Sequence, residues 1–111
     1  MISENLSRQI AKFLMVKQEQ LGKDLKYFLL SWSVIGTDKD NNTQLGLMLT
    51  ADTGPLFPEK RETVCLAAIS ATKPGAFAQI RKAAIDLAAA YDGQYEFRVG
   101  FVPPVHPDWS L

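Results

Sequence analysis

Two stretches of alternating apolar and polar residues, joined by a short polar segment, constrain the fold of this chain most. They span residues 25–36 and 43–51. In the first stretch every second residue is apolar, and these residues share one face of the expected strand: Phe28, Leu30, Trp32 and Val34. Alternation with a period of two is typical of a half-buried strand. Because residues 37–42 are rich in turn-forming Asp and Asn, the two stretches predict an antiparallel hairpin.

Two further strands are expected. Residues 62–71 are apolar at nearly every position, which favours a place inside the sheet rather than at its edge. Polar and apolar residues alternate over residues 94–102. Glu96 and Arg98 are expected to point outward, and four residues are expected to point inward: Tyr95, Phe97, Val99 and Phe101. This last strand follows a helix, so it is expected either parallel to the third strand through a right-handed crossover or antiparallel elsewhere.

A first helix is expected over residues 3–21. Its apolar stripe is about 100° wide and consists of Leu6, Ile10, Phe13, Leu14 and Leu21. Ser3 is the expected N-cap and Gly22 the expected stop. Lys17 falls inside the stripe, and we expect its stem to pack while its ammonium reaches water.

A second helix is expected from Pro74-Gly75 to about Tyr91, with Thr72 or Lys73 as its cap. The stripe expected to face the sheet consists of Phe77, Ile80, Ala84, Leu87, Ala88 and Tyr91. The opposite flank carries Ala78, Ile85 and Ala89, and the only clearly polar strip is Gln79, Lys82 and Asp86. A helix this apolar around its axis is normally covered on more than one side. Either the first helix covers the flank, or a second copy of the chain does.

The order αβββαβ predicts one α+β two-layer domain, with two helices packed on a mostly antiparallel four-stranded sheet. The domain takes in all of residues 1–111, with a proline-rich tail at 103–111. An apolar content of 47% with no net charge excludes a disordered chain.

Composition also bears on setting and partners. The single cysteine, the lack of a secretory signal and the lack of a long apolar run indicate a cytoplasmic protein without a membrane segment. Residues 1–60 hold seven basic and seven acidic side chains, and residues 61–111 hold five of each. A nucleic-acid partner is therefore unlikely on charge alone; it would need two groups of cations to converge, Arg8, Lys12, Lys23 and Lys26 or Arg81, Lys82 and Arg98.

No catalytic, cofactor or metal site is predicted. His106, the single histidine, is expected on the surface or packed in the tail, and Cys65 is expected to be a small core residue. Residues 38–42 imitate the start of a calcium loop, but a turn is favoured because position twelve is Leu49. The scattered glycines form no phosphate-binding loop. A carboxylate pair of Glu96 with Asp92 or Glu62 has nothing in the sequence to bring it together.

The αβββαβ order resembles the opening of the type III secretion chaperones over about residues 3–102. The resemblance rests on the order of elements, and it implies an α+β sandwich that dimerises through its second helix and neighbouring strands. The chain lacks the strong acidity of that family, and its tail from Pro103 is too short and proline-rich for their closing helix.

We therefore expect a small non-catalytic interaction domain that acts as a homodimer and binds another polypeptide. The candidate partner surface is Tyr27, Leu29, Ala78, Ile85 and Ala89, to which the first helix adds Met15. The alternative is a ligand-binding protein or enzyme with a pocket between the sheet and the helices. Its expected lining is Tyr27, Trp32, Tyr95 or Trp109.

Overall fold

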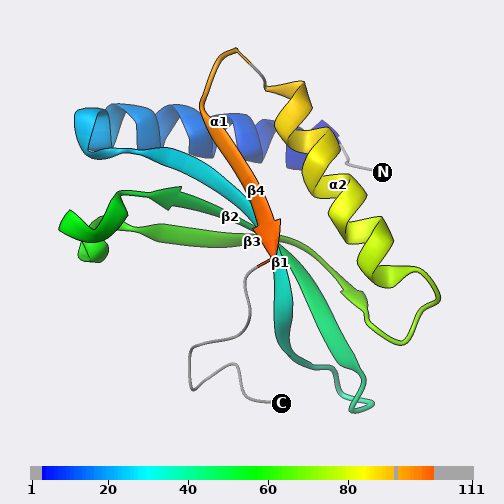
Figure 1. Cartoon of the computed structure of the whole chain (residues 1–111). Helices are drawn as coiled ribbons and strands as arrows, with labels where there is room; N and C mark the ends of the chain where they lie inside the picture. The colour runs from blue at the N-terminus through cyan, green and yellow to red at the C-terminus, as the bar shows by residue number, and fades with distance from the viewer. Residues whose placement is uncertain (1–3, 92, 102–111) are drawn as a thin grey trace.

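The computed structural model describes residues 4–91 and 93–101. Its helices and strands follow the predicted order αβββαβ (Figure 1). They are α1 (Glu4–Leu21), β1 (Tyr27–Thr37), β2 (Thr43–Asp52), β3 (Glu62–Ser70), α2 (Ala76–Ala90) and β4 (Phe97–Phe101), with short 3-10 turns at Gly22–Asp24, Gly54–Leu56 and Pro58–Lys60. The predicted N-cap Ser3, Asp92 and the tail 103–111 lie outside the described residues.

The four strands form one mixed sheet in the order β3-β2-β1-β4. β1 pairs antiparallel with β2, and β2 pairs antiparallel with β3. β4 lies parallel to β1, with Phe28 opposite Phe97 and Trp32 opposite Phe101. The last strand is thus parallel, but its neighbour is the first strand and not the third.

The prediction that the third strand lies inside the sheet is wrong, because β3 is an edge strand. Its core-side residues Val64, Leu66 and Ile69 are half-buried, whereas most of the residues between them are small and exposed. Cys65, Ala67 and Ala68 are apolar and exposed, but their side chains are small, so each adds only a small apolar area to the surface. A run of small apolar residues therefore does not require neighbours on both sides.

The β1–β2 hairpin is the predicted one, and its tip is held by one carboxylate. Asp38 Oδ1 accepts hydrogen bonds from the backbone N–H groups of Asp40 and Asn42, both at 2.9 Å. Its Oδ2 accepts from Gln44 Nε2 at 3.2 Å. The predicted turn is confirmed, since this carboxylate organises the loop backbone.

Both helices pack on one face of the sheet. One buried cluster joins residues of α1, β1, β2 and α2: Ile10, Leu14, Phe28, Leu30, Leu45, Leu47, Leu49, Ala51, Ala76, Ile80, Ala84 and Leu87. Because side chains alternate along a strand, the residues between these in β1 and β2 point to the opposite face. We call that opposite face the open face because neither helix covers it; in β1 it carries Tyr27, Leu29, Ser31 and Ser33, of which the two serines are nevertheless buried.

The helix ends differ in part from expectation. Gly22 has φ 51°, the left-handed conformation that stops α1 as predicted. α2 follows Gly75, whose φ is 74°, and no side chain caps it, so the predicted cap at Thr72 or Lys73 is wrong. Within the described residues, no helix is long and apolar enough to cross a membrane.

The stem of Lys17 packs as expected, but its ammonium lies against other side chains rather than in open water. Its side chain is only 17% exposed, and its ammonium forms an ion pair with Glu62 at the start of β3. The same ammonium donates a hydrogen bond to Gln20 Oε1 at 3.1 Å. Lys17 thereby joins α1 to the edge strand.

Candidate interaction surface

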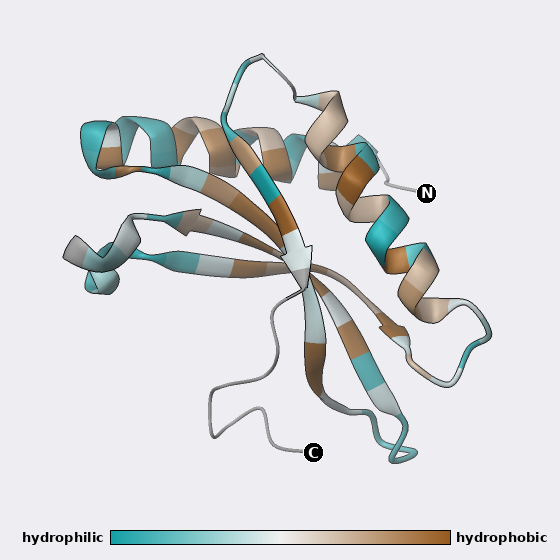
Figure 2. Ribbon diagram, viewed as in Figure 1, coloured by the Kyte–Doolittle hydropathy of each residue, from teal (hydrophilic) through white to brown (hydrophobic). Residues whose placement is uncertain are grey.

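The apolar flank of α2 is uncovered in the described part of the chain. Ile85 is 47% exposed and Phe77 52% exposed, and Ala78 and Ala89 are exposed beside them. We call these four residues the α2 flank. Figure 2 shows apolar colours over much of α2, interrupted by hydrophilic bands in the middle of the helix.

α1 does not cover this flank because it packs over another part of the sheet. It inserts Ile10 and Leu14 into the common core. It approaches α2 where the Tyr91 hydroxyl lies 3.5 Å from the Ser7 carbonyl oxygen, just beyond the C-terminal end of α2 (Figure 1). The alternative in which the first helix shelters the flank is therefore wrong for the described residues.

Phe77 was expected to face the sheet, and that expectation is also wrong. The buried positions of α2 are Ala76, Ile80, Ala84 and Leu87. At 100° per residue, the mean direction of these four buried positions lies about 60° from the direction of Phe77 around the helix axis. Because Ala76 fills the buried place at the first turn, Phe77 lies at the margin and adds a large apolar side chain to the exposed flank.

Tyr27 and Leu29, the other two predicted surface residues, lie on the open face, opposite to α2. Both are half-buried. The guanidinium of Arg98 lies over the Tyr27 ring, 4.2 Å from its centroid. The five candidate residues thus form two separate surfaces, and Tyr27 already has a cationic partner within the chain.

Two further large apolar side chains are exposed. Met15 of α1 is 53% exposed, and it was expected opposite the core stripe. Val99 of β4 is 38% exposed although its strand face was expected inward. The reason is position: β4 is an edge strand with no described neighbour beyond it.

Cys65 is exposed on β3, which corrects the prediction that it is a core residue. Its Sγ lies 3.4 Å from the Ala67 carbonyl oxygen. Partial burial raises the pKa of the Cys65 thiol. A raised pKa reduces the thiolate fraction at neutral pH, so the site does not resemble that of an activated nucleophile.

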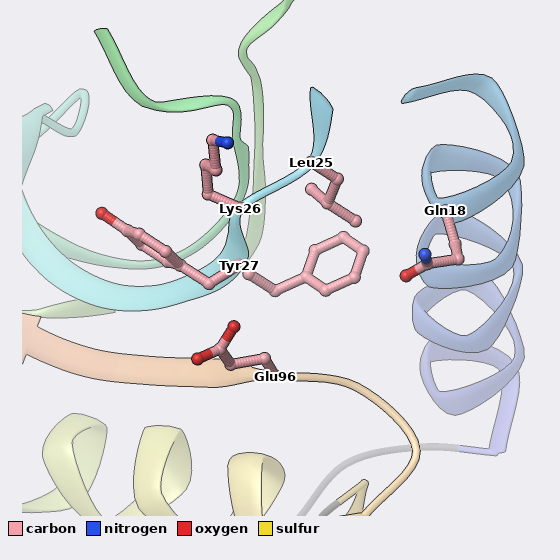
Figure 3. A pocket seen from close by; sticks show the side chains of 6 residues that line it. Gln18, Leu25, Lys26, Tyr27 and Glu96 are labelled. Atoms are coloured by element: carbon pink, nitrogen blue, oxygen red, sulfur yellow. The ribbon is translucent and has the colours of Figure 1, made fainter. Parts of the chain in front are cut away.

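Figure 3 shows a small pocket beside the C-terminal half of α1. Its volume is about 210 Å³, and its lining is Gln18, Leu25, Lys26, Tyr27, Phe28 and Glu96. The Gln18 amide faces the pocket, whereas the Lys26 amino group points away from it (Figure 3). The pocket is smaller than the roughly 300–1,000 Å³ of ordinary small-molecule sites.

The other chemical candidates do not assemble. Glu62 and Glu96 belong to opposite edges of the sheet, about 14 Å apart at the usual strand spacing. Among the described residues, no group of three or more His, Cys, Asp or Glu side chains could hold a metal. His106, Trp109 and Asp92 lie outside those residues.

The second group of cations, Arg81, Lys82 and Arg98, does not converge either. Arg98 lies on the open face, where it stacks on Tyr27. Lys82 lies on α2, on the other side of the sheet, and pairs with Asp86 at 2.7 Å. Arg8 pairs with Glu4 at 2.9 Å.

Comparison with known proteins adds no relative: no family model, no curated protein and no solved structure matches the chain.

Proposed function

We propose that this protein is a small non-catalytic interaction domain that acts as a homodimer and binds another polypeptide. The observation that carries the dimer is the α2 flank, in which Phe77 and Ile85 are each about half exposed. Cytoplasmic localisation is part of the proposal and rests on the single cysteine and the sequence composition.

Burial of the α2 flank contributes part of the free energy that a dimer needs. Fully burying a large apolar side chain contributes about 1.5–3 kcal/mol, so covering the exposed halves contributes about 1 kcal/mol for each residue. Two residues from each of two chains give about 4 kcal/mol before the cost of association. Val99 on edge strand β4, against which α2 packs, adds to the same tendency.

The flank also suits a two-fold contact. Ala78 and Ala89 lie on either side of Ile85 along one helix line, and small residues allow a second helix to approach closely. In an antiparallel pair of α2 helices, Ala78 of one copy can lie opposite Ala89 of the other. Such a self-complementary contact closes a dimer without leaving an open end.

The test compares two variants with the same added charge. Ile85→Asp places a carboxylate in the middle of the flank, and Gln79→Asp places one on the polar strip of the same helix. Size-exclusion chromatography with light scattering is expected to give a dimer for the natural chain and for Gln79→Asp. Ile85→Asp is expected to be monomeric with an unchanged circular dichroism spectrum.

A natural chain that elutes as a monomer at tens of micromolar contradicts the proposal. A dimer that survives Ile85→Asp contradicts the role of the α2 flank. The small-ligand alternative has less support. The pocket of Figure 3 is small and has exposed Gln18 and Glu96 side chains, and a second pocket, of about 340 Å³, is bordered by the exposed side chains of Gln9, Lys12 and Glu62.

A further inference from the structure

The outer edge of β3 lacks two usual protections of an edge strand, charge and proline, although a bulge at Leu66 interrupts its pairing with β2. β3 pairs with β2 on one side, and no described strand lies on its other side. From Thr63 to Ala71 it carries no charged residue and no proline. Edge strands are normally blunted by such residues, because their unpaired backbone groups recruit other strands.

One hydrogen bond shows which backbone groups point outward. The Ala71 N–H donates to the Thr43 carbonyl oxygen at 2.8 Å, so Ala71 faces β2. Pairing is regular from Ser70 back to Ala67. Since bonded and outward-facing residues alternate in an antiparallel ladder, the N–H and carbonyl of Ala68 point away from β2.

An apolar ledge borders this edge on the helix side of the sheet. Phe13 and Val16 of α1 are half-buried, and they line a pocket of about 340 Å³ that reaches Glu62 at the start of β3. Val64 and Leu66 of β3 are half-buried and pack against the core beneath the helices. We call Phe13, Val16, Val64 and Leu66 the α1–β3 ledge.

The ledge has a charge beside it. Lys12 also lines the pocket and is exposed. Among residues 4–91 and 93–101, no acidic side chain pairs with Lys12, whereas Lys17 is neutralised by Glu62. An acidic residue of a bound chain would therefore meet a free cation there.

We infer that the β3 edge and the α1–β3 ledge bind an extended segment of another polypeptide, which adds to the sheet as a fifth strand. Its main chain pairs with the outward groups of β3, which supplies affinity. Its alternate side chains are apolar and rest on the ledge, and an acidic residue lies near Lys12. This inference rests on the proposed function. It places the contact with the other polypeptide at the β3 edge, away from the α2 flank that forms the dimer.

A second copy of the chain is the less suitable occupant. The α2 flank already provides a two-fold contact in the proposed dimer. A further pairing of β3 with β3 of another dimer would link dimers into an open chain rather than a closed assembly.

The experiment uses a phage library of random twelve-residue peptides, with the natural protein as the immobilised target. Selection is expected to enrich peptides with apolar residues at alternate positions and an acidic residue at one end. An enriched peptide is then made synthetically, and its affinity is measured by fluorescence anisotropy against the natural chain and four variants.

Two pairs of variants carry the test. Ala68→Pro removes one outward N–H without removing a hydrogen bond to β2, and Ala68→Val keeps that N–H. The proline is expected to weaken binding at least about tenfold, and the valine less than about threefold. Lys12→Glu is expected to weaken binding, whereas Lys39→Glu in the hairpin loop makes the same charge change and is expected to leave it unaltered.

Peptides that lack the alternation, or that bind Ala68→Pro as tightly as the natural chain, overturn the inference. So does a failure to enrich any peptide. Oligomers larger than a dimer that Ala68→Pro reduces also overturn it, since they make a second copy the occupant of β3. Light scattering on the same samples separates the two proposals, because Ala68→Pro is expected to leave the α2 dimer intact.

Discussion

Gly46 of β2 is the position where the smallest substitution is expected to have the clearest effect. A Cβ added there would lie 2.7 Å from Ile35 Cγ2 and 3.1 Å from Met48 Sδ. Ordinary van der Waals contacts of such an atom begin at 3.4 Å, so the Ile35 methyl would have to move by about 0.7 Å. Cγ2 is bonded directly to Cβ, so it can move only by a χ1 rotation or a backbone shift.

Overpacking of this kind costs about 1–3 kcal/mol, and replacing glycine in a strand recovers roughly 0.5–1 kcal/mol. We therefore expect Gly46→Ala to lower the free energy of unfolding by about 1–2 kcal/mol. Urea unfolding followed by far-ultraviolet circular dichroism, at one fixed protein concentration, measures this quantity.

Gly100 of β4 is the matched control. A Cβ at Gly100 meets nothing within 4 Å, so Gly100→Ala is expected to be neutral or slightly stabilising. The double variant Gly46→Ala with Ile35→Ala removes the obstructing methyl, and its loss should be about 1 kcal/mol smaller than the sum of the single losses. Equal stability of Gly46→Ala and Gly100→Ala would refute the packing described here.

Three further outcomes follow from the core, the edge strand and its ion pair. Leu14→Ala, at a side chain with no exposed surface, is expected to lower the free energy of unfolding by about 2–5 kcal/mol in the same urea assay; a loss below about 1 kcal/mol contradicts its place in the core. Cys65 is expected to react with iodoacetamide in the folded protein, with the midpoint of its pH–rate profile above that of free cysteine because burial raises its pKa; a midpoint at or below free cysteine contradicts this. Lys17→Met is expected to change stability by less than about 1 kcal/mol, since the Glu62 carboxylate is 48% exposed; a larger loss in the urea assay means that the ion pair matters more than its exposure suggests.

Local patterns in the sequence were sufficient for the order of elements. The alternation in β1 and β2, with the polar segment between them, predicted the hairpin, and Asp38 and Asn42 make the turn contacts expected of such residues. The apolar stripe of α1 predicted the buried Ile10 and Leu14. These features depend on neighbours within a few residues, so the sequence alone carries them.

The arrangement of strands depended on contacts that no local pattern encodes. The apolar run of β3 is compatible with a central or an edge strand, and its small residues tolerate exposure at Cys65 and Ala68. The position of β4 beside β1 depends on how α2 crosses the sheet. The predicted inner place of β3 and the predicted neighbour of β4 were therefore both wrong because they depend on pairing between distant segments. Val99 is exposed for the same reason, since its strand lies at the edge of the sheet.

The candidate surface was predicted in part. The apolar flank of α2 was visible from helical periodicity, and Ile85 is exposed as that pattern suggested, although the exposed Arg81 lies between Phe77 and Ile85 on the helix surface. Tyr27 and Leu29 could not be placed relative to the flank, because their position depends on which face of the sheet the helices cover. The β3 edge and the α1–β3 ledge were missed for the same reason, although the absence of charge between Thr63 and Ala71 was a usable signal.

Sedimentation equilibrium of the natural chain, from about 1 to 50 micromolar, tests the dimer most directly. The uncovered side chains Phe77 and Ile85 predict a species with twice the 12.3 kDa mass of one chain in the upper part of that range. A single species of 12.3 kDa at every concentration would mean that one chain tolerates this apolar helix surface in water, and the proposed dimer would be wrong.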